Sequence, residues 1–443
     1  MANTYLTRTP SSSGNRKTFT FSFWFKRGSL GSNQYIYTQY NSSNSYNSAI
    51  YLGSSDNFLF WDYTNAYQLN LRLNRLFRDV NAWYHIVIAV DTTQATASNR
   101  AKIYINGVQE TSFSTATYPS QNLDLRINEY QPQQIGISRY GSTNENFFDG
   151  SMSHFHFIDG TAYTPSAFGE TDSTTGEWKI KTSPSVTYGT NGYFILKDGN
   201  SVTDQSGKGN NFTVGGGTLT KTEDCPSNVF ATLNPLDNYY TAATFSNGNT
   251  SQTTHAGNYG WNASTLGMTS GKFYVEMKQT GFSGSSNYNI VGITSRQLTA
   301  SNIYLGQGSE DWGYYSQGNG VYNGGSFLTT YASYTTNDII GIALDLDNNK
   351  LYFSKNGTWQ NSGVPTSGST GTGAISVTAN KTYFFASGEY GTSLVCNNSW
   401  NFGNGFFGTT AVSSAGTNAS GNGIFEYDVP SGYTALSTKG LNL

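Results

Sequence analysis

The sequence predicts an all-β protein made of two tandem antiparallel β-sandwiches. The first observation is composition: the 443 residues include 50 glycines and 32 tyrosines and only 12% are charged, which favours short strands joined by many turns. The second is alternation: in residues 337–359 (NDIIGIALDLDNNKLYFSKNGTW) apolar side chains recur at every second position from Ile340 to Leu346, as in a strand with one buried face. The third is that residues 83–107 repeat the same order of strand, Asp, polar turn, short strand and Asn-Gly, and Asn-Gly is a strong hairpin signal.

The charge pattern argues against several classes of function. The net charge is −3 and Lys and Arg form no cluster, so neither nucleic acid nor an anionic membrane is expected as a partner. Residues 1–10 lack the apolar run of a signal peptide. No stretch approaches the ~20 apolar residues that a membrane span needs. The protein is therefore expected to be made in the cytoplasm without membrane insertion and to stay soluble.

The two cysteines, Cys225 and Cys396, are too few for a disulfide framework. Two interpretations stay open. They are unrelated thiols, as a reducing site of synthesis favours, or they pair because the start and the end of the second sandwich lie together.

Residues 1–181 are interpreted as the first sandwich. Residues 18–26 (TFTFSFWFK) alternate aromatic with small or polar side chains, which predicts a strand with its phenylalanines on one face. Five segments resemble the LamG, or concanavalin A-like lectin/glucanase, family in order and spacing: FSFWF at 21–25, WYHI at 83–86, IYING at 103–107, IG at 135–136 and FDGSM at 148–152. The resemblance implies a jelly-roll sandwich, and a family whose members mostly bind glycans or proteins.

Residues 182–235 are interpreted as a closing strand and a connector. The strand-like phrase YFIL at 193–196 comes first, and a flexible triple glycine follows at 215–217. The phrase CPSNVF at 225–230, with LNPL at 233–236, resembles the lead-in of many proteins of marine tailed bacteriophages.

Residues 236–410 are interpreted as the second sandwich, and residues 411–443 as a C-terminal tail. Seven segments resemble the SPRY family: GKFYVE at 271–276, VGI at 291–293, WGY at 312–314, DIIG and LDLD within 338–347, LYF at 351–353, KNG at 355–357 and NFG at 401–403. The resemblance implies another jelly-roll-like sandwich, of a kind usually used for protein recognition through its loops. The closing phrase YDVPSGYTAL at 427–436 resembles marine phage virion proteins that carry SPRY regions.

No constellation of catalytic residues is apparent. A retaining glucanase needs two carboxylates about 5–5.5 Å apart, and the family's signature is Glu-x-Asp-x-x-Glu. The nearest phrases, GluThrAsp at 170–172 and GluTyrAsp at 426–428, lack the third glutamate. His154 and His156 share the spacing of a metal pair on one strand face, but no third ligand follows, so a solvated strand face is the preferred interpretation. The protein is expected not to be an enzyme.

Aromatic residues in polar segments are the candidate ligand-binding residues. One group lies in an Asn- and Ser-rich stretch, and the other in Gly-rich segments: Tyr35, Tyr37, Tyr40 and Tyr46, and Trp312, Tyr314, Tyr315 and Tyr322. Aromatic faces stack on sugar rings, and neighbouring amides and hydroxyls supply hydrogen bonds. The alternative, that these rings pack inside the sandwiches, stays open.

Calcium is the one cofactor considered, because the LamG resemblance implies that some relatives hold it with loop carboxylates. Such oxygen ligands suit a hard cation. Asp91 and Asp149 are the candidate ligands. The alternative for both is an ordinary turn aspartate.

The expected function is that of a non-enzymatic phage virion protein, a tail-fibre or appendage adhesin that binds a host-surface glycan or protein. The alternative is a structural capsid-decoration or fibre-attachment protein that contacts only other virion proteins. Both rest on the resemblance, as does the expectation of a homotrimer, since phage fibres are often trimeric. Exposed aromatic loop tips would favour adhesion, and buried ones would favour the structural role.

Overall fold

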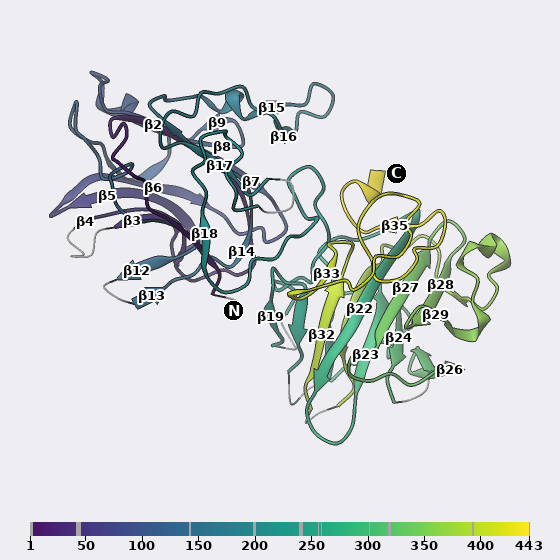
Figure 1. Ribbon diagram of the computed structural model, residues 1–443. Coiled ribbons are helices and arrows are strands. Elements are labelled where there is room, and N and C mark those ends of the chain that lie inside the picture. Colours follow the sequence, from purple (N-terminus) through teal and green to yellow (C-terminus); the bar gives the residue numbers. More distant parts are fainter. Residues whose placement is uncertain are drawn as a thin grey trace. The chain divides into compact units, whose positions relative to one another are not determined.

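The structure, a computed structural model, confirms the predicted all-β class with two compact units, residues Met1–Lys221 and Thr222–Leu443 (Figure 1). It describes residues 3–40, 46–140, 143–197, 201–238, 242–255, 257, 259–300, 302–317, 320–391 and 394–442, except for the side chains of Tyr46, Asn47 and Tyr140. The boundary between the units falls inside the segment that was expected to connect them. Each unit is described by itself.

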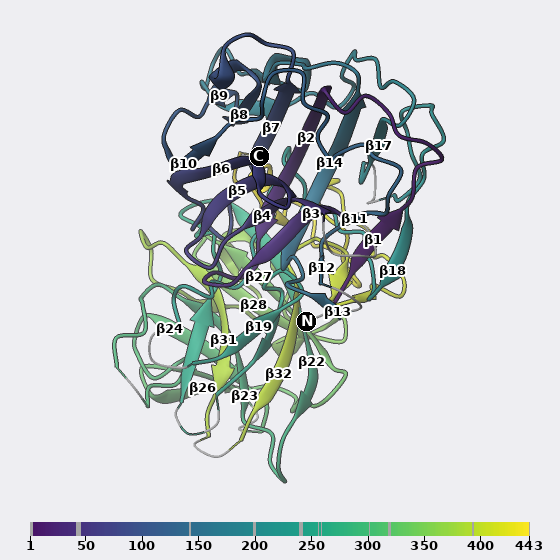
Figure 2. The same ribbon diagram turned by 90° about the vertical axis from the view of Figure 1, so that its left-hand side faces the viewer.

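The first unit consists of an eight-stranded sheet, a six-stranded sheet and two hairpins. The eight-stranded sheet has the order β10-β6-β5-β4-β3-β11-β1-β18, and most of its strands lie side by side in Figure 2. Its strands are β1 (Tyr5–Arg8), β3 (Gln34–Tyr40), β4 (Tyr46–Leu52), β5 (Asn57–Thr64), β6 (Tyr67–Leu76), β10 (Phe113–Thr117), β11 (Gln133–Ile135) and β18 (Thr213–Gly216).

The six-stranded sheet has the order β17-β14-β2-β7-β8-β9. Its strands are β2 (Thr18–Arg27), β7 (Tyr84–Asp91), β8 (Ala101–Ile105), β9 (Val108–Gln109), β14 (Gly150–Asp159) and β17 (Tyr193–Ile195). The hairpins pair β12 (Ser138–Tyr140) with β13 (Thr143–Glu145), and β15 (Gly169–Thr171) with β16 (Trp178–Ile180).

The alternation read in residues 18–26 correctly predicts which face of β2 is buried. Phe19, Phe21, Phe23 and Phe25 are fully buried in one hydrophobic core, between the two sheets of the first unit. β2 pairs with β7 on one side and β14 on the other, so it is a central strand. The hairpin predicted at Asn106-Gly107 also forms, because both residues take positive φ and join β8 to β9.

The second unit packs a nine-stranded sheet on a six-stranded sheet. The nine-stranded sheet contains β19 (Thr244–Ser246), β20 (Ser251–Thr253), β22 (Lys272–Phe282), β27 (Ile339–Asp345), β28 (Lys350–Lys355), β29 (Thr358–Trp359), β30 (Ile375–Ser376), β32 (Cys396–Asn401) and β35 (Thr434–Ala435). The six-stranded sheet, in the order β21-β31-β23-β24-β25-β26, contains β21 (Gly260–Ala263), β23 (Asn289–Thr294), β24 (Asp311–Tyr315), β25 (Gly320–Asn323), β26 (Ser326–Thr330) and β31 (Phe384–Glu389). A hairpin joins β33 (Phe406–Phe407) to β34 (Thr410–Ala411).

Residues 337–359, which carry the predicted strand and the Asn-Gly signal, form β27, β28 and β29, a three-stranded meander. Ile342 lies opposite Phe353, and Asn356 and Gly357 take positive φ where β28 turns into β29. The described helices are short 3-10 turns: η1 (Ala97–Asn99), η2 (Pro165–Ala167), η3 (Gln360–Ser362), η4 (Pro365–Thr370) and η5 (Gly440–Asn442). None of the helices in the described ranges is long and apolar enough to cross a membrane.

Residues 411–442, which were expected to form a tail, pack on the second unit. Phe425, Val429 and Tyr433 join Tyr274 and Tyr352 in a buried cluster on the outer face of the nine-stranded sheet, and β35 pairs in parallel with β22 (Figure 1). Both cysteine thiols are free, Cys396 buried and Cys225 half-buried, so the structure favours the interpretation as unrelated thiols.

One buried carboxyl of the second unit is expected to make stability depend on pH. Burial raises the pKa of Glu389 to about 8 from the ordinary glutamate value of 4.5, although the Thr254 hydroxyl donates to it at 2.7 Å. Between these two values the folded state holds a proton that the unfolded state releases, so the free energy of unfolding falls as pH rises. The slope is at most about 1.4 kcal/mol per pH unit.

The variant Glu389→Gln, which stays neutral, should lose this part of the pH dependence. Urea unfolding of the wild-type protein and the variant at several pH values across the window measures it. The comparison also removes the parallel contribution of Glu276, whose pKa burial raises to about 7. Equal slopes for the two proteins would contradict the assignment.

Candidate functional site

Five aromatic side chains stand on the outer face of the eight-stranded sheet of the first unit. They are Tyr35 on β3, Tyr51 on β4, Trp61 and Tyr63 on β5, and Tyr67 on β6. The period of two explains the placement of Tyr35, Tyr51 and Trp61, since their strand neighbours point to the core. Tyr63 and Tyr67 pair at the end of β5 and the start of β6, where the register shifts. On β5, Phe58 and Phe60 are buried, whereas Trp61 and Tyr63 are partly exposed. We call this set of five residues the aromatic face.

The strand register brings these rings together. Tyr35 lies opposite Tyr51, and their rings stack with centroids 4.5 Å apart and planes 6° apart. Tyr67 meets Trp61 edge-on at 5.9 Å and Tyr63 at 5.2 Å. Tyr67 is 51% exposed. Four neighbouring strands therefore contribute to a surface roughly 15 Å wide, given the ~4.8 Å spacing of strands.

Ring contacts and a hydrogen bond set the orientation of several of these rings. Trp61 lies near the Tyr51 hydroxyl, and Ser138 lies near the Tyr35 hydroxyl. The Tyr63 hydroxyl donates to the carbonyl of Asn65 at 3.1 Å. Burial raises the pKa of Tyr35 to about 12, so its ring stays neutral at physiological pH. The aromatic face is thus a neutral surface of largely preorganised rings.

Polar side chains border the aromatic face on β6. Asn70 lies opposite Trp61, and Arg72 lies opposite Leu59. The Arg72 charge acts on the Tyr51 hydroxyl, and Arg72 makes no ion pair with any residue that the structure describes. A ligand with apolar faces and hydroxyls can stack its faces on the rings. Its hydroxyls can hydrogen-bond the neighbouring amide and guanidinium groups.

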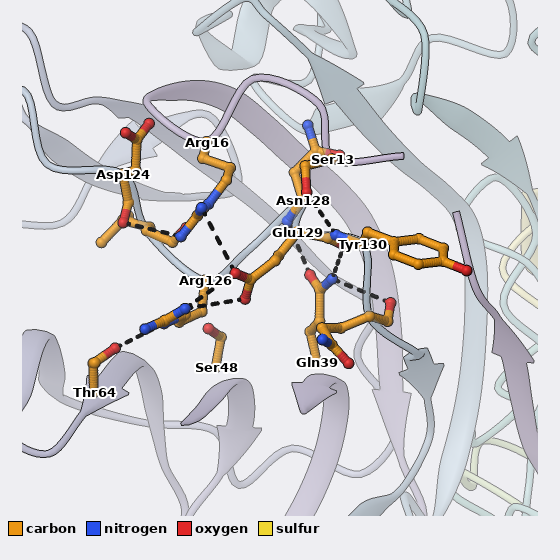
Figure 3. A network of polar contacts seen from close by, with 12 residues as sticks. Ser13, Arg16, Gln39, Ser48, Thr64, Asp124, Arg126, Asn128, Glu129 and Tyr130 are labelled. Carbon is orange, nitrogen blue, oxygen red and sulfur yellow. Dashed lines mark hydrogen bonds and ion pairs between the residues drawn. The ribbon is translucent and has the colours of Figure 1, made fainter. Parts of the chain in front are cut away.

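A polar network holds one end of the same sheet (Figure 3). Arg126 donates to Glu129 at 3.0 Å and to the Thr64 hydroxyl at 2.9 Å, and Arg16 pairs with Glu129 at 3.7 Å. The Gln39 side chain accepts from the Asn128 amide at 2.9 Å and donates to the Glu129 carbonyl at 2.6 Å. These bonds fix the loop that contains Glu129 to the ends of β3 and β5, the strands that carry Tyr35, Trp61 and Tyr63.

The carboxylates at this end of the sheet are occupied by internal donors. Asp62 accepts from Ser48 and from the Arg126 amide, and Asp159 accepts from Asn128 and from the backbone of Asn15 and Asn191. A cation would have to displace these bonds.

The structure does not assemble a calcium site around the two predicted ligands. Asp91 accepts hydrogen bonds from Thr93 and Gln94 in its own turn, and Asp149 lies near the buried guanidinium of Arg27. In the part of the chain that the structure describes, no three His, Cys, Asp or Glu residues converge as metal ligands. Calcium binding by Asp91 and Asp149 therefore stays a prediction, and the described residues supply no further ligands beside them.

The preferred interpretation of His154 and His156 as a solvated strand face is wrong. Both are buried, and both rings contact Phe194. The Tyr188 hydroxyl hydrogen-bonds His156 at 2.9 Å. Sequence alternation could not show this, because the cover consists of Phe168 and Tyr188 from a distant segment.

Three of the eight predicted ligand-binding aromatics, Tyr37, Trp312 and Tyr314, lie in the sandwich cores, as the alternative interpretation had it. The expectation of exposed rings is wrong for five of the eight, which are buried: Tyr37, Tyr40, Trp312, Tyr314 and Tyr315. Tyr35 belongs to the aromatic face, and Tyr315 and Tyr322 lie on the outer side of the second unit's six-stranded sheet. The side chain of Tyr46 lies outside the described residues. Tyr51, Trp61, Tyr63 and Tyr67 were not among the predicted residues, although the alternation of FLFWDY at 58–63 places Trp61 and Tyr63 opposite the phenylalanines.

The acidic phrases considered for glycoside hydrolysis are held in ion pairs and turns. Glu170 and Asp172 both pair with Lys179, at 3.6 and 3.2 Å. Glu426 accepts from Ser413, and Asp428 accepts from Thr417. None of the four belongs to β3, β4, β5 or β6, the strands that carry the aromatic face.

Two family models match the chain. The model of the concanavalin A-like lectin/glucanases superfamily (Laminin_G_3) matches residues 2–167, and the SPRY domain model matches residues 272–386. The chain therefore contains a concanavalin A-like domain and a SPRY domain, which confirms both resemblances. Such domains are generally binding modules rather than catalytic ones. No curated protein matches the chain.

Several solved structures are similar at low identity. The SPRY domain of human HERC1 is 19% identical with a TM-score of 0.32, and the match covers 38% of this chain and 96% of that one. A heptameric SAP-like pentraxin from Limulus polyphemus is 18% identical with a TM-score of 0.27, over 36% of this chain and 71% of that one. Domain 4 of AbnA, an arabinanase of Geobacillus stearothermophilus solved with arabinotriose, is 18% identical with a TM-score of 0.27, over 36% and 68%. With such low TM-scores, these likenesses carry no weight for function.

Proposed function

We propose that this chain is a non-enzymatic glycan-binding protein that uses the aromatic face of its first unit. The observation that carries the proposal is the set of five partly exposed rings, tied in place and bordered by Asn70 and Arg72. Flat neutral rings stack on the C–H faces of sugars, and the bordering groups hydrogen-bond their hydroxyls. A concanavalin A-like domain, generally a binding module, agrees with this use.

The same surface supports binding without catalysis. Glycoside hydrolysis needs a pair of carboxyl groups beside the bound sugar. The buried Asp62 of β5 already accepts from Ser48 and the Arg126 amide, so it is not available as one of that pair.

The finer part of the proposal is that the protein is a virion surface component, a tail-fibre or appendage adhesin for host recognition. It is supported by the resemblance of residues 225–236 and 427–436 to marine tailed-phage proteins. Its partners would be other virion proteins and a host-surface glycan or protein, and the assembly would be a homotrimer. The alternative is a structural capsid-decoration or fibre-attachment protein. In that case the aromatic face, including the exposed ring of Tyr67, would be covered by a neighbouring virion protein.

Trp61→Ala is expected to lower affinity for a cognate polysaccharide about tenfold or more, because it removes the largest ring of the aromatic face. Trp61→Phe should retain part of the affinity. The measurement is binding of the purified protein to a glycan array, followed by titration of the best ligand. Tyr130→Ala is the matched control, since Tyr130 is 57% exposed elsewhere on the same unit and its loss should change nothing.

Adhesion itself is tested on cells. Saturable binding of the purified protein to host cells that also blocks adsorption of the intact virion would support an adhesin. Absence of glycan and cell binding, with the protein still adding back onto particles that lack it, would favour the structural alternative. Equal binding by wild-type protein and Trp61→Ala would remove the aromatic face as the site.

A further inference from the structure

Six tyrosines gather on the outer side of the six-stranded sheet of the second unit. Tyr315 is on β24 and Tyr322 on β25, and the other four come from the segments beside the sheet: Tyr259, Tyr288, Tyr304 and Tyr390. Alternation explains the choice, because Trp312 and Tyr314 of β24 point to the core and Tyr315 points away from it. We call these six residues the tyrosine cluster.

The rings of the tyrosine cluster form one continuous surface. Tyr390 is central: its ring centroid lies 4.4 Å from that of Tyr304, 5.3 Å from Tyr315 and 5.5 Å from Tyr259. Tyr288 stacks parallel to Tyr315 at 6.3 Å, with planes 8° apart. Tyr322 meets Tyr315 at 6.3 Å.

A buried apolar layer supports the cluster from below. Trp261, Ile290, Leu305 and Ala386 are buried there. The loop that carries Tyr304 and Leu305 lies close against β24, because a Cβ on Gly313 would come within 2.3 Å of the Leu305 carbonyl oxygen. The rings therefore rest on a packed base, which lowers the entropy that binding would cost.

The hydroxyl groups of the cluster are free for a ligand. In the described part of the chain, none of the six hydroxyls hydrogen-bonds another residue, and none is a buried atom without a partner. Five of the six tyrosines keep part of their surface exposed, and Tyr315, which is 7% exposed, lies buried among their rings. By contrast, the Tyr314 and Tyr334 hydroxyls on the core side donate to backbone carbonyls.

Two charged pairs at the ends of the same sheet's strands are neutralised within the protein. The Arg296 guanidinium lies over the Trp261 ring at 4.8 Å and makes a two-pronged ion pair with Asp311. Glu310 pairs with Lys381. Arg296 and Lys381 are already paired with carboxylates, so neither offers its charge to a phosphate or carboxylate ligand. The surface therefore suits an uncharged ligand.

We propose that the tyrosine cluster is a second carbohydrate-binding surface, one that takes neutral saccharides. Five partly exposed tyrosines whose hydroxyls have no internal partner, each both donor and acceptor, match a ligand that presents many hydroxyls, and the ring faces match the C–H faces of sugar rings. This site is separate from the aromatic face and does not depend on it. A peptide rich in aromatic residues is the competing occupant, since Phe327 extends the rings at 5.8 Å from Tyr322.

The test uses the full chain labelled with 3-fluorotyrosine and carrying Trp61→Ala, which disables the aromatic face. Neutral oligosaccharides of glucose, mannose and galactose are titrated, and fluorine resonances are assigned with single Tyr→Phe variants. The expected result is saturable shifts of the Tyr304, Tyr315 and Tyr390 resonances. The resonance of Tyr334, buried in the core, should not move.

Three variants and one control then distinguish the contribution of a tyrosine ring to saccharide affinity from that of its hydroxyl. Tyr390→Ala should lower the affinity tenfold or more and Tyr304→Ala similarly. Tyr390→Phe, which keeps the ring, should lower it only severalfold. Tyr427→Ala, outside the cluster, should have no effect.

Three outcomes would overturn the proposal: no shift with any saccharide of the panel, equal affinity of Tyr390→Ala and its parent, or tight binding of an aromatic peptide that neutral saccharides fail to displace. The proposal for the aromatic face fails by a different result. In that case Trp61→Ala, whose tyrosine cluster is intact, would bind glycans as well as the wild-type protein does.

Discussion

Replacing Glu276 by glutamine is expected to lower the free energy of unfolding of the second unit by about 3 kcal/mol. The carboxylate is buried in β22 and receives hydrogen bonds from four donors. The backbone amides of Glu426 and Tyr427 donate to different oxygens, each at 2.8 Å. An amide side chain has a single oxygen, so at least one of these buried N–H groups would face an NH2 group.

The second expected effect of Glu276→Gln is local release of the C-terminal segment. Glu276 joins the sheet to the residues that follow Phe425, and Phe425, Val429 and Tyr433 cover the sheet beside it. Amide exchange of Glu426 and Tyr427 should therefore accelerate before the sheet itself unfolds. Denaturant unfolding and hydrogen exchange measure the two effects.

Glu310→Gln is the matched control for Glu276→Gln. Glu310 forms a partly exposed ion pair with Lys381, and such pairs contribute at most about 1 kcal/mol. A loss for Glu276→Gln as small as that for Glu310→Gln would show that the buried carboxylate does not hold the segment.

Replacing Asp56 by alanine is expected to destabilise the first unit by about 3–5 kcal/mol. Asp56 accepts from Arg27 at 2.9 Å, from the Gly31 amide at 2.8 Å and from Arg78 at 3.2 Å. The Arg27 side chain is fully buried, and two of its nitrogens already have no hydrogen-bond partner among the described residues. Without Asp56, that buried charge would keep a hydrogen bond to the Phe77 carbonyl, at 2.9 Å, and the more distant charge of Asp149.

The same substitution should weaken glycan binding. Asp56 lies in the turn that joins β4 to β5, the strands that carry Tyr51, Trp61 and Tyr63. Thermal or denaturant unfolding gives the stability, and titration of the glycan ligand gives the affinity.

Two comparisons test whether the cause is the unpaired charge. Asp56→Ala combined with Arg27→Met should recover much of the lost stability, because it removes the buried charge as well. Glu110→Gln, which weakens the pair of Glu110 (9% exposed) with Arg75 (53% exposed), should cost less than Asp56→Ala, because it leaves no fully buried charge without its partner. If the double variant is no more stable than Asp56→Ala, the loss comes from the turn and not from the charge.

Local patterns were enough to predict the strands and hairpins near the centre of each sandwich. The phenylalanines of β2, the apolar positions of β27 and the Asn-Gly turns at 106–107 and 356–357 behave as predicted. Each depends on a period of two or on the backbone preference of one or two residues. The candidate site was harder to predict: Tyr35, Tyr315 and Tyr322 lie on outer sheet faces, but Tyr37, Trp312 and Tyr314 point into the cores.

Strand period alone shows that Tyr314 and Tyr315 point to opposite faces, but not which of them faces the core. That choice depends on the sheet packed against β24, which comes from distant segments of the chain. In the first unit, the burial of His156 likewise depends on Phe168 and Tyr188, which lie outside its strand.

The sequence by itself determined the all-β class, the two sandwich types and the positions of the main turns, because these follow from short-range chemistry and from motifs within each half. Only the tertiary structure decided which rings gather into the aromatic face and the tyrosine cluster, and that residues 411–442 cover a sheet. Those outcomes rest on contacts between residues far apart in the chain, such as Glu276 with Tyr427, or β1 with β11 and β18. Such contacts form only where burying apolar surface and satisfying buried polar groups outweigh the entropy of closing long loops.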